Sequence, residues 1–188
     1  MKAVASDLHG RTGEVTCTVQ HVPALVRPVL EDVTKWADLD PDTGPLEILD
    51  WLGGAFTYDQ HKGGTDFASP FGVDVVAARD GGVEQVCNDW QDSVTTTDPS
   101  VGNFVAIRYA VDANLVYYTI YAHLRHTETP IVEGDTVVVG DVIGQADHTG
   151  RSTAPHLHLE VRMGSMEAEN YVCPYANGLI EGPATQAQ

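Results

Sequence analysis

The stretch His156-Leu157-His158-Leu159-Glu160-Val161-Arg162 alternates polar and aliphatic side chains over its whole length. Because successive side chains of a strand point to opposite faces, this pattern predicts a β-strand with its three aliphatic side chains in a core. The other face would carry both imidazoles, Glu160 and Arg162. Two histidines at i and i+2 lie about 6.5–7 Å apart along a strand, close enough to share one metal centre. The alternative is a polar strand face with two ordinary surface histidines.

Short apolar runs separated by turn-forming residues continue on the N-terminal side of this stretch. They are Val73–Ala78, Phe104–Ala110, Leu115–Ala122, Thr136–Val139 and Val142–Gln145. Many short strands with turns between them predict a mainly β domain of antiparallel sheets, with Phe104–Ala110 and Leu115–Ala122 as an antiparallel pair. The Asp80-Gly81-Gly82 segment predicts a turn.

The first part of the chain shows a different pattern. Apolar side chains at spacings of four and three within Val22–Trp36 predict an amphipathic helix, which Pro23 and Pro28 would limit. Asp38–Pro45 is rich in turn formers and predicts a loop. We therefore expect an N-terminal arm with little helix at residues 1–44, a main domain at 45–180 and a tail at 181–188.

Two further segments carry side chains suited to chemistry. His61 and Asp66 lie on either side of a Gly-Gly pair, whose backbone freedom would let an imidazole and a carboxylate converge. Two such donors and a third from elsewhere would make a zinc site that leaves one position open. The alternative is a capped turn with an exposed ion pair. In Tyr121-Ala122-His123-Leu124, His123 follows a predicted strand, and the alternative there is a half-buried histidine bonded to backbone.

Charge and composition restrict the function classes. The 188 residues include 27 Asp plus Glu against 10 Lys plus Arg, for a formal net charge of -17. The basic residues are scattered singly, which argues against nucleic-acid binding. The acidity fits either an ordinary soluble protein or a salty medium. Cys17, Cys87 and Cys173 are too few and too far apart for a zinc knuckle, and their pairing stays open.

The three histidine-bearing segments together resemble the signatures of the lysostaphin-like zinc metallopeptidases, which cut peptidoglycan peptides. Those signatures are His-x-Gly-x-Asp, Tyr-x-His-Leu and His-x-His, in this order. They stand here as His61-Lys62-Gly63-Gly64-Thr65-Asp66, Tyr121-Ala122-His123-Leu124 and Pro155-His156-Leu157-His158-Leu159-Glu160-Val161. The resemblance extends over about Asp38–Pro174 and departs from the pattern at one point, because His61 and Asp66 are five positions apart rather than four.

The resemblance implies a shallow groove over antiparallel sheets and an endopeptidase that hydrolyses peptidoglycan cross-bridges or stem peptides. It implies zinc bound by His61, Asp66 and His158, with His123 and His156 as the catalytic imidazoles that move protons for a metal-activated water. The alternatives are an inactive member that binds peptidoglycan or activates an amidase, and a metal-binding module of another β-barrel type. For Glu160, a surface carboxylate paired with Arg162 is favoured over a role in orienting an imidazole.

The remaining expectations concern partners and place of action. A peptidoglycan peptidase would act in the periplasm or outside the cell, although Met1–Gly10 lacks an apolar signal segment, so a signal would have been removed or export would work otherwise. No run of about 18 apolar residues is present, so we expect no membrane span. We expect a monomer.

Overall fold

The computed structural model describes residues 2–6, 12–16, 25–29, 36–40, 47–50, 55–57, 64–67, 69–90, 101–126, 131–152, 154–167, 170 and 172. The elements assigned within these residues are all strands: β1 (Lys2–Ser6), β2 (Thr12–Thr16), β3 (Trp36–Asp40), β4 (Glu47–Asp50), β5 (Ala55–Thr57), β6 (Thr65–Phe67), β7 (Asp74–Val76), β8 (Gly81–Cys87), β9 (Asn103–Ala110), β10 (Val116–Leu124), β11 (Thr136–Val137), β12 (Val142–Gln145) and β13 (Leu157–Met163). The prediction of a mainly β chain with little helix is confirmed.

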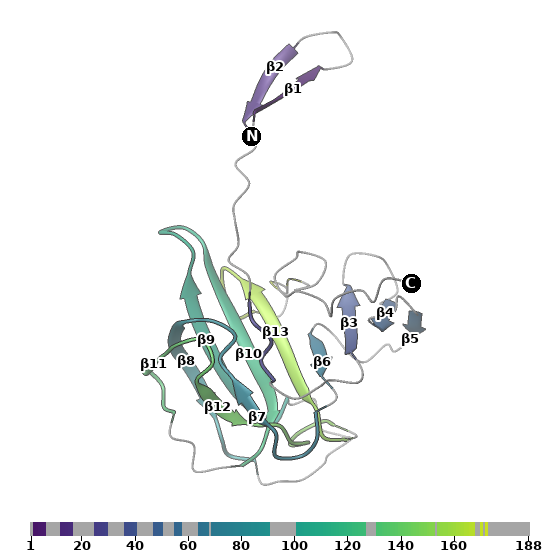
Figure 1. Ribbon diagram of the computed structural model, residues 1–188, viewed down its shortest axis with the longest axis vertical. Coiled ribbons are helices and arrows are strands. Elements are labelled where there is room, and N and C mark those ends of the chain that lie inside the picture. Colours follow the sequence, from purple (N-terminus) through teal and green to yellow (C-terminus); the bar gives the residue numbers. More distant parts are fainter. Residues whose placement is uncertain are drawn as a thin grey trace.

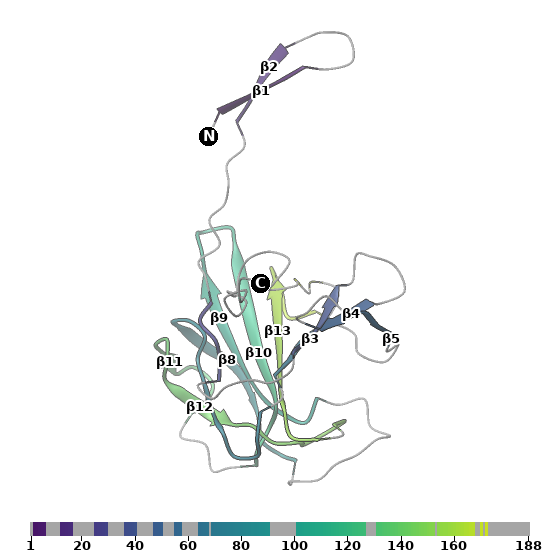
Figure 2. The ribbon, with the colours of Figure 1, turned by 45° about the vertical axis from the view of Figure 1, so that its right-hand side comes forward.

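The described strands form one large sheet and two small ones, all with antiparallel neighbours. The large sheet has the order β11-β8-β9-β10-β13-β6-β3-β4-β5 (Figure 1). β12 pairs with β7, and β1 pairs with β2 in a hairpin that lies away from the large sheet in both views (Figures 1 and 2). The predicted antiparallel pair is present as β9 and β10. β13 lies between β10 and β6, which brings Asp66 directly opposite His158.

The core lies on one face of the large sheet, as the alternation in β13 predicts. Leu157, Leu159 and Val161 are each 0% exposed. They belong to one cluster with alternate side chains of β9 and β10 and with side chains of the small β7–β12 sheet: Val105, Ile107, Tyr109, Tyr117, Tyr121, Val75 and Ile143. The opposite face of β13 carries His158, Glu160 and Arg162. The apolar side of the strand therefore anchors the polar side in a fixed register.

The small sheet is fastened to this core by hydrogen bonds as well as by packing. The hydroxyl of Tyr121, from the middle of β10, accepts a hydrogen bond of 2.8 Å from the backbone nitrogen of Ala78.

Val29 forms an antiparallel bridge with Val75, and the carbonyl of Pro28 accepts from the nitrogen of Val76. The described residues 25–29 are thus extended, and the prediction of a helix is wrong there. Pro28 fits this extended segment because its missing N–H is not needed.

Two other local predictions are wrong in part, since only Asp80 of the predicted turn lies in the bend before β8. Gly81 and Gly82 begin the seven-residue strand β8 rather than forming a turn. A Cβ on Gly81 would lie 2.6 Å from the Ile107 side chain, so glycine at this position allows close strand packing. Asp38 and Asp40, at the start of the predicted loop Asp38–Pro45, belong to β3, and residues 41–45 lie outside the described residues. In the part of the chain that the structure describes, no helix has the length and apolar character needed to cross a membrane.

Candidate active site

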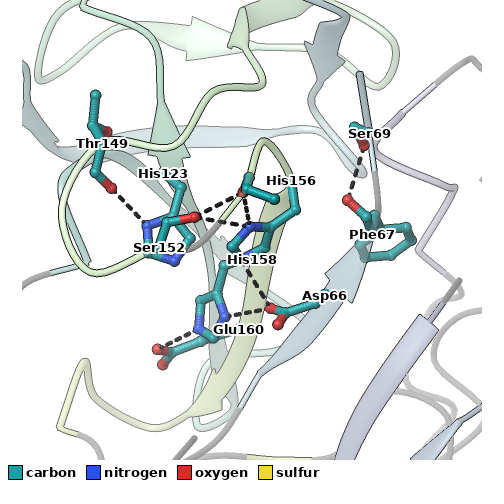
Figure 3. Close-up of polar contacts among 10 residues, drawn as sticks. Asp66, Phe67, Ser69, His123, Thr149, Ser152, His156, His158 and Glu160 are labelled. Carbon is teal, nitrogen blue, oxygen red and sulfur yellow. Dashed lines mark hydrogen bonds and ion pairs between the residues drawn. The ribbon is translucent and has the colours of Figure 1, made fainter. Parts of the chain in front are cut away.

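The pairing of β13 with β6 joins two predicted site residues that are 92 positions apart. His158 lies opposite Asp66 in the register, and His158 Nδ1 is 2.8 Å from Asp66 Oδ1 (Figure 3). The His158 side chain is 6% exposed and that of Asp66 is 27% exposed. A nitrogen and an oxygen this close can both reach a single ion at about 2.0–2.2 Å.

His156 joins the same cluster from the residue just before β13. Its Nε2 is 3.6 Å from Asp66 Oδ1. Its Nδ1 donates to the carbonyl of Ala154 at 2.8 Å and lies 3.1 Å from the hydroxyl of Ser152, which itself donates to that carbonyl. Nδ1 therefore carries a hydrogen, and Nε2 is the ring nitrogen that faces Asp66.

His123 reaches the cluster from a bulge in β10. The register of β10 against β9 shifts between Ala122 and Leu124, and His123 has a φ of 58°, a left-handed backbone conformation unusual for a side chain of this size. Its ring centroid lies 4.6 Å from that of His156 and 5.6 Å from that of His158. The bulge therefore directs the imidazole of His123 toward the site. A regularly pleated strand would not direct it there.

A buried hydrogen-bond network fixes the bulge and the ring of His123. His123 Nδ1 donates to the carbonyl of Thr149 at 2.8 Å. The Thr149 hydroxyl donates to the carbonyl of Leu124 at 2.7 Å and accepts from the nitrogen of Asn103 at 3.1 Å. Gly102 permits this approach, since a Cβ there would lie 2.3 Å from the Thr149 carbonyl oxygen. In His123, as in His156, Nδ1 thus donates to a backbone carbonyl, and Nε2 is the other ring nitrogen.

The surroundings of the cluster shift two histidine pKa values in opposite directions. Burial would lower the pKa of His158, but hydrogen bonds to Asp66 and Glu160 and their negative charges outweigh it and raise the pKa to about 10. Burial, together with the neighbouring imidazoles of His156 and His158, lowers the pKa of His123 to about 3. At neutral pH His123 is therefore a neutral base, whereas each ring nitrogen of His158 has a carboxylate oxygen beside it.

The predicted ligand His61 lies outside the described residues. Within the residues that are described, no group of three histidine, cysteine, aspartate or glutamate side chains is arranged to hold a metal ion. The structure does explain why a glycine stands at Gly64, one of the two glycines between His61 and Asp66. Gly64 has a φ of +107°, and a Cβ there would lie 2.3 Å from Cε1 and 2.5 Å from Nε2 of His158. The backbone at Gly64 therefore lies directly against the His158 ring.

We expect Gly64→Ala to destabilise the fold and displace the His158 ring. Backbone strain at positive φ costs roughly 1–3 kcal/mol and overpacking costs a similar amount, so the free energy of unfolding should fall by about 2–5 kcal/mol. Chemical denaturation measures this change. Gly134→Ala is the matched control, because Gly134 has a φ of +90° with open space around its Cβ. Equal losses in the two variants would contradict a specific contact with His158.

The sequence analysis did not predict the burial of one residue of the site or the contacts of two others. Glu160 is not the surface carboxylate that was favoured, because it is 5% exposed and contacts both Arg162 and His158. The alternation of β13 did place Glu160 on the face of His158, which is the signal for this contact. Thr149 and Ser152 fix the two other imidazoles through contacts made across loops, for which the sequence offered no periodic signal.

An antiparallel sheet that gathers three imidazoles and a carboxylate is typical of a metal-dependent hydrolase. Comparison with known families agrees: residues 60–171, more than half of the chain, match Peptidase family M23. The chain therefore belongs to this peptidase family, and both the predicted resemblance and the prediction of a peptidase are confirmed.

Curated relatives are similar to part of the chain. Peptidoglycan DD-endopeptidase ShyB of Vibrio cholerae is 36% identical over 124 residues, which are 65% of this chain and 26% of ShyB. Peptidoglycan DD-endopeptidase ShyA of the same organism is 37% identical over 98 residues, 52% of this chain and 19% of ShyA. The chain thus spans about a quarter or less of the length of these relatives.

Solved structures show the same fold. A solution structure of lysostaphin aligns with a TM-score of 0.52 at 23% identity, covering 82% of this chain and 57% of that one. A zinc-containing peptidase from Vibrio cholerae aligns with a TM-score of 0.51 at 24% identity, covering 92% of this chain and 45% of that one. These similarities confirm the predicted lysostaphin-like fold.

Proposed function

We propose that the protein is a zinc-dependent endopeptidase that hydrolyses peptide bonds in bacterial peptidoglycan, in the periplasm or outside the cell. The observation that carries the proposal is the convergence of Asp66 Oδ1 and His158 Nδ1 at 2.8 Å, with His123 and His156 beside them. Membership of family M23 and the names of the relatives support the substrate class.

The donor set fits zinc. Zinc in hydrolases takes imidazole nitrogens and carboxylate oxygens and keeps one position open, which Asp66, His158 and the predicted third ligand His61 would satisfy. When bound, zinc supplies a Lewis acid that makes water nucleophilic near neutral pH and stabilises negative charge on a carbonyl oxygen. The reason to place it here is that a carboxylate and an imidazole face each other in a largely buried site.

The two remaining imidazoles would move protons. His123 and His156 each donate from Nδ1 to a backbone carbonyl, so each presents Nε2 as a proton acceptor toward the site. One would take a proton from the attacking water, and one would deliver a proton to the leaving amine. Their rings are 4.6 Å apart between centroids, so both roles can be filled at one scissile bond.

Digestion of purified sacculi of several wall types, followed by mass spectrometry of the released muropeptides, tests this proposal. We expect soluble peptides from cleaved cross-links, loss of release with a chelator and recovery with zinc. The name DD-endopeptidase in the relatives favours cleavage at a bond to a D-amino acid over a glycyl bond. Undiminished binding to sacculi without peptide release would instead support an inactive, wall-binding protein.

A further inference from the structure

Glu160 is a buried carboxylate placed between two bases. Its residue is 5% exposed, and its two oxygens have different partners. Oε1 is 3.1 Å from His158 Nε2, and Oε2 accepts from Arg162 Nε at 2.7 Å (Figure 3 shows the His158 contact). A carboxylate costs free energy when it is removed from water unless charges and hydrogen bonds compensate it, and here both oxygens are compensated.

Arg162 is itself held in place on both sides. Its Nη2 lies 2.5 Å from Glu160 Oε2, and its Nη1 donates to the carbonyl of Met166 in the turn that follows β13. The guanidinium therefore contacts one carboxylate oxygen through two nitrogens while a third nitrogen is fixed to the backbone. Such a contact leaves Glu160 little freedom to rotate away from His158.

The alternation of β13 sets up this series of contacts. His158, Glu160 and Arg162 occupy positions i, i+2 and i+4 on one face, opposite Ala122, Ile120 and Tyr118 of β10. Adding Asp66 from β6, the face carries carboxylate, imidazole, carboxylate and guanidinium in spatial order. Each of these groups contacts the next one, and hydrogen bonds in such a series strengthen one another in low-dielectric surroundings.

We propose that Glu160, held by Arg162, is a positioning residue that fixes the ring of His158 so that Nε2 donates to Glu160 and Nδ1 is presented beside Asp66. The inference rests on the proposed function, because it assigns Nδ1 as the atom that binds the metal. Ring nitrogens that bind metals commonly depend on such a partner at the opposite nitrogen.

The other two imidazoles strengthen this inference by contrast. In His123 and His156 it is Nδ1 that donates to a protein oxygen, a backbone carbonyl in each case, so Nε2 faces the site. In His158 the nitrogens are exchanged, and the partner of Nε2 is a charged carboxylate rather than a carbonyl. The protein thus orients its predicted ligand and its predicted proton carriers in opposite senses.

Zinc affinity of Glu160→Gln, measured by competition with a chromophoric chelator, tests the inference without any need for turnover. Gln keeps the shape of Glu160 but loses the charge that Arg162 and His158 share. We expect zinc to bind about 10- to 100-fold more weakly, with altered absorption of the cobalt-substituted protein. Arg162→Lys, which loses the double contact to Oε2, should weaken binding in the same direction by less.

Glu133→Gln is the matched control, because Glu133 accepts from the nitrogen of Val86 at an exposed position. It should leave zinc affinity unchanged. Zinc affinity within twofold of the parent protein in folded Glu160→Gln would overturn the inference, even if its thermal stability fell. If Glu160→Gln does not fold, unchanged affinity in Arg162→Lys overturns it instead. A parent protein that binds zinc but releases no muropeptides would refute the proposed function and leave this inference standing.

Discussion

Replacing His158 by alanine should abolish stoichiometric zinc binding and peptide release together. The substitution removes Nδ1, the nitrogen 2.8 Å from Asp66 Oδ1, and leaves a carboxylate without its imidazole partner in the register of β6 and β13. Lewis-acid assistance is worth several kcal/mol, and each 1.4 kcal/mol is about tenfold in rate, so turnover should fall by roughly a thousandfold or more. Elemental analysis of zinc per chain and muropeptide release measure the two effects.

His148→Ala is the control for this prediction. His148 pairs with the buried Asp147 at 2.5 Å and packs against Phe71 with ring centroids 6.4 Å apart, outside the cluster of His123, His156 and His158. It should retain zinc. A His158→Ala protein that still carries one zinc per chain would refute the assignment of His158 as a ligand.

Replacing His123 by alanine should separate chemistry from metal binding. His123 faces His156 and His158 but is assigned to proton transfer, so zinc content should stay at the parent level while turnover falls by about 10²- to 10⁴-fold. Because only the chemical step loses a group, the loss should appear in kcat rather than in KM. Steady-state kinetics on a defined muropeptide would measure both constants.

The backbone at His123 calls for a second variant. With a φ of 58°, alanine there keeps the left-handed strain but loses the hydrogen bond to Thr149. His123→Gly removes the imidazole and tolerates that φ, so equal losses of turnover in both variants would assign the effect to the imidazole. Retained turnover in either variant would contradict a catalytic role for His123.

The strands around the site could be predicted because their signal is local. In β13 every second side chain is aliphatic, and Leu157, Leu159 and Val161 are buried as this period requires. The apolar runs that became β9 and β10 were bounded by turn formers for the same reason. Periodicity therefore predicted which face of β13 meets the core.

The wrong local predictions arose where tertiary contacts override the pattern. Spacings of four and three suit a helix, yet Leu25 and Val29 enter the core from an extended segment that pairs with β7. Glycines are common in turns, but here Gly81 lets β8 lie close to β9. In both cases the deciding neighbour is distant in sequence.

The sequence predicted which residues belong to the site better than it predicted their geometry. The resemblance grouped Asp66, His123, His156 and His158, and the structure brings these four together. The left-handed bulge at His123 and the burial of Glu160 depend on loops and strands that a period of two does not encode. The orientations of His123 and Glu160 therefore could not be predicted from the sequence.

The pairing of β6 with β13 has a consequence for the lifetime of the protein. Asp66 and His158 are separated by 92 positions, so an ion held by both would act as a cross-link that closes the chain between them into one loop. Closing so long a loop restricts the unfolded chain, and a ligand that binds only the native state lowers the population of unfolded chain. The supply of metal ions would then affect how well the protein resists foreign proteases as well as its turnover.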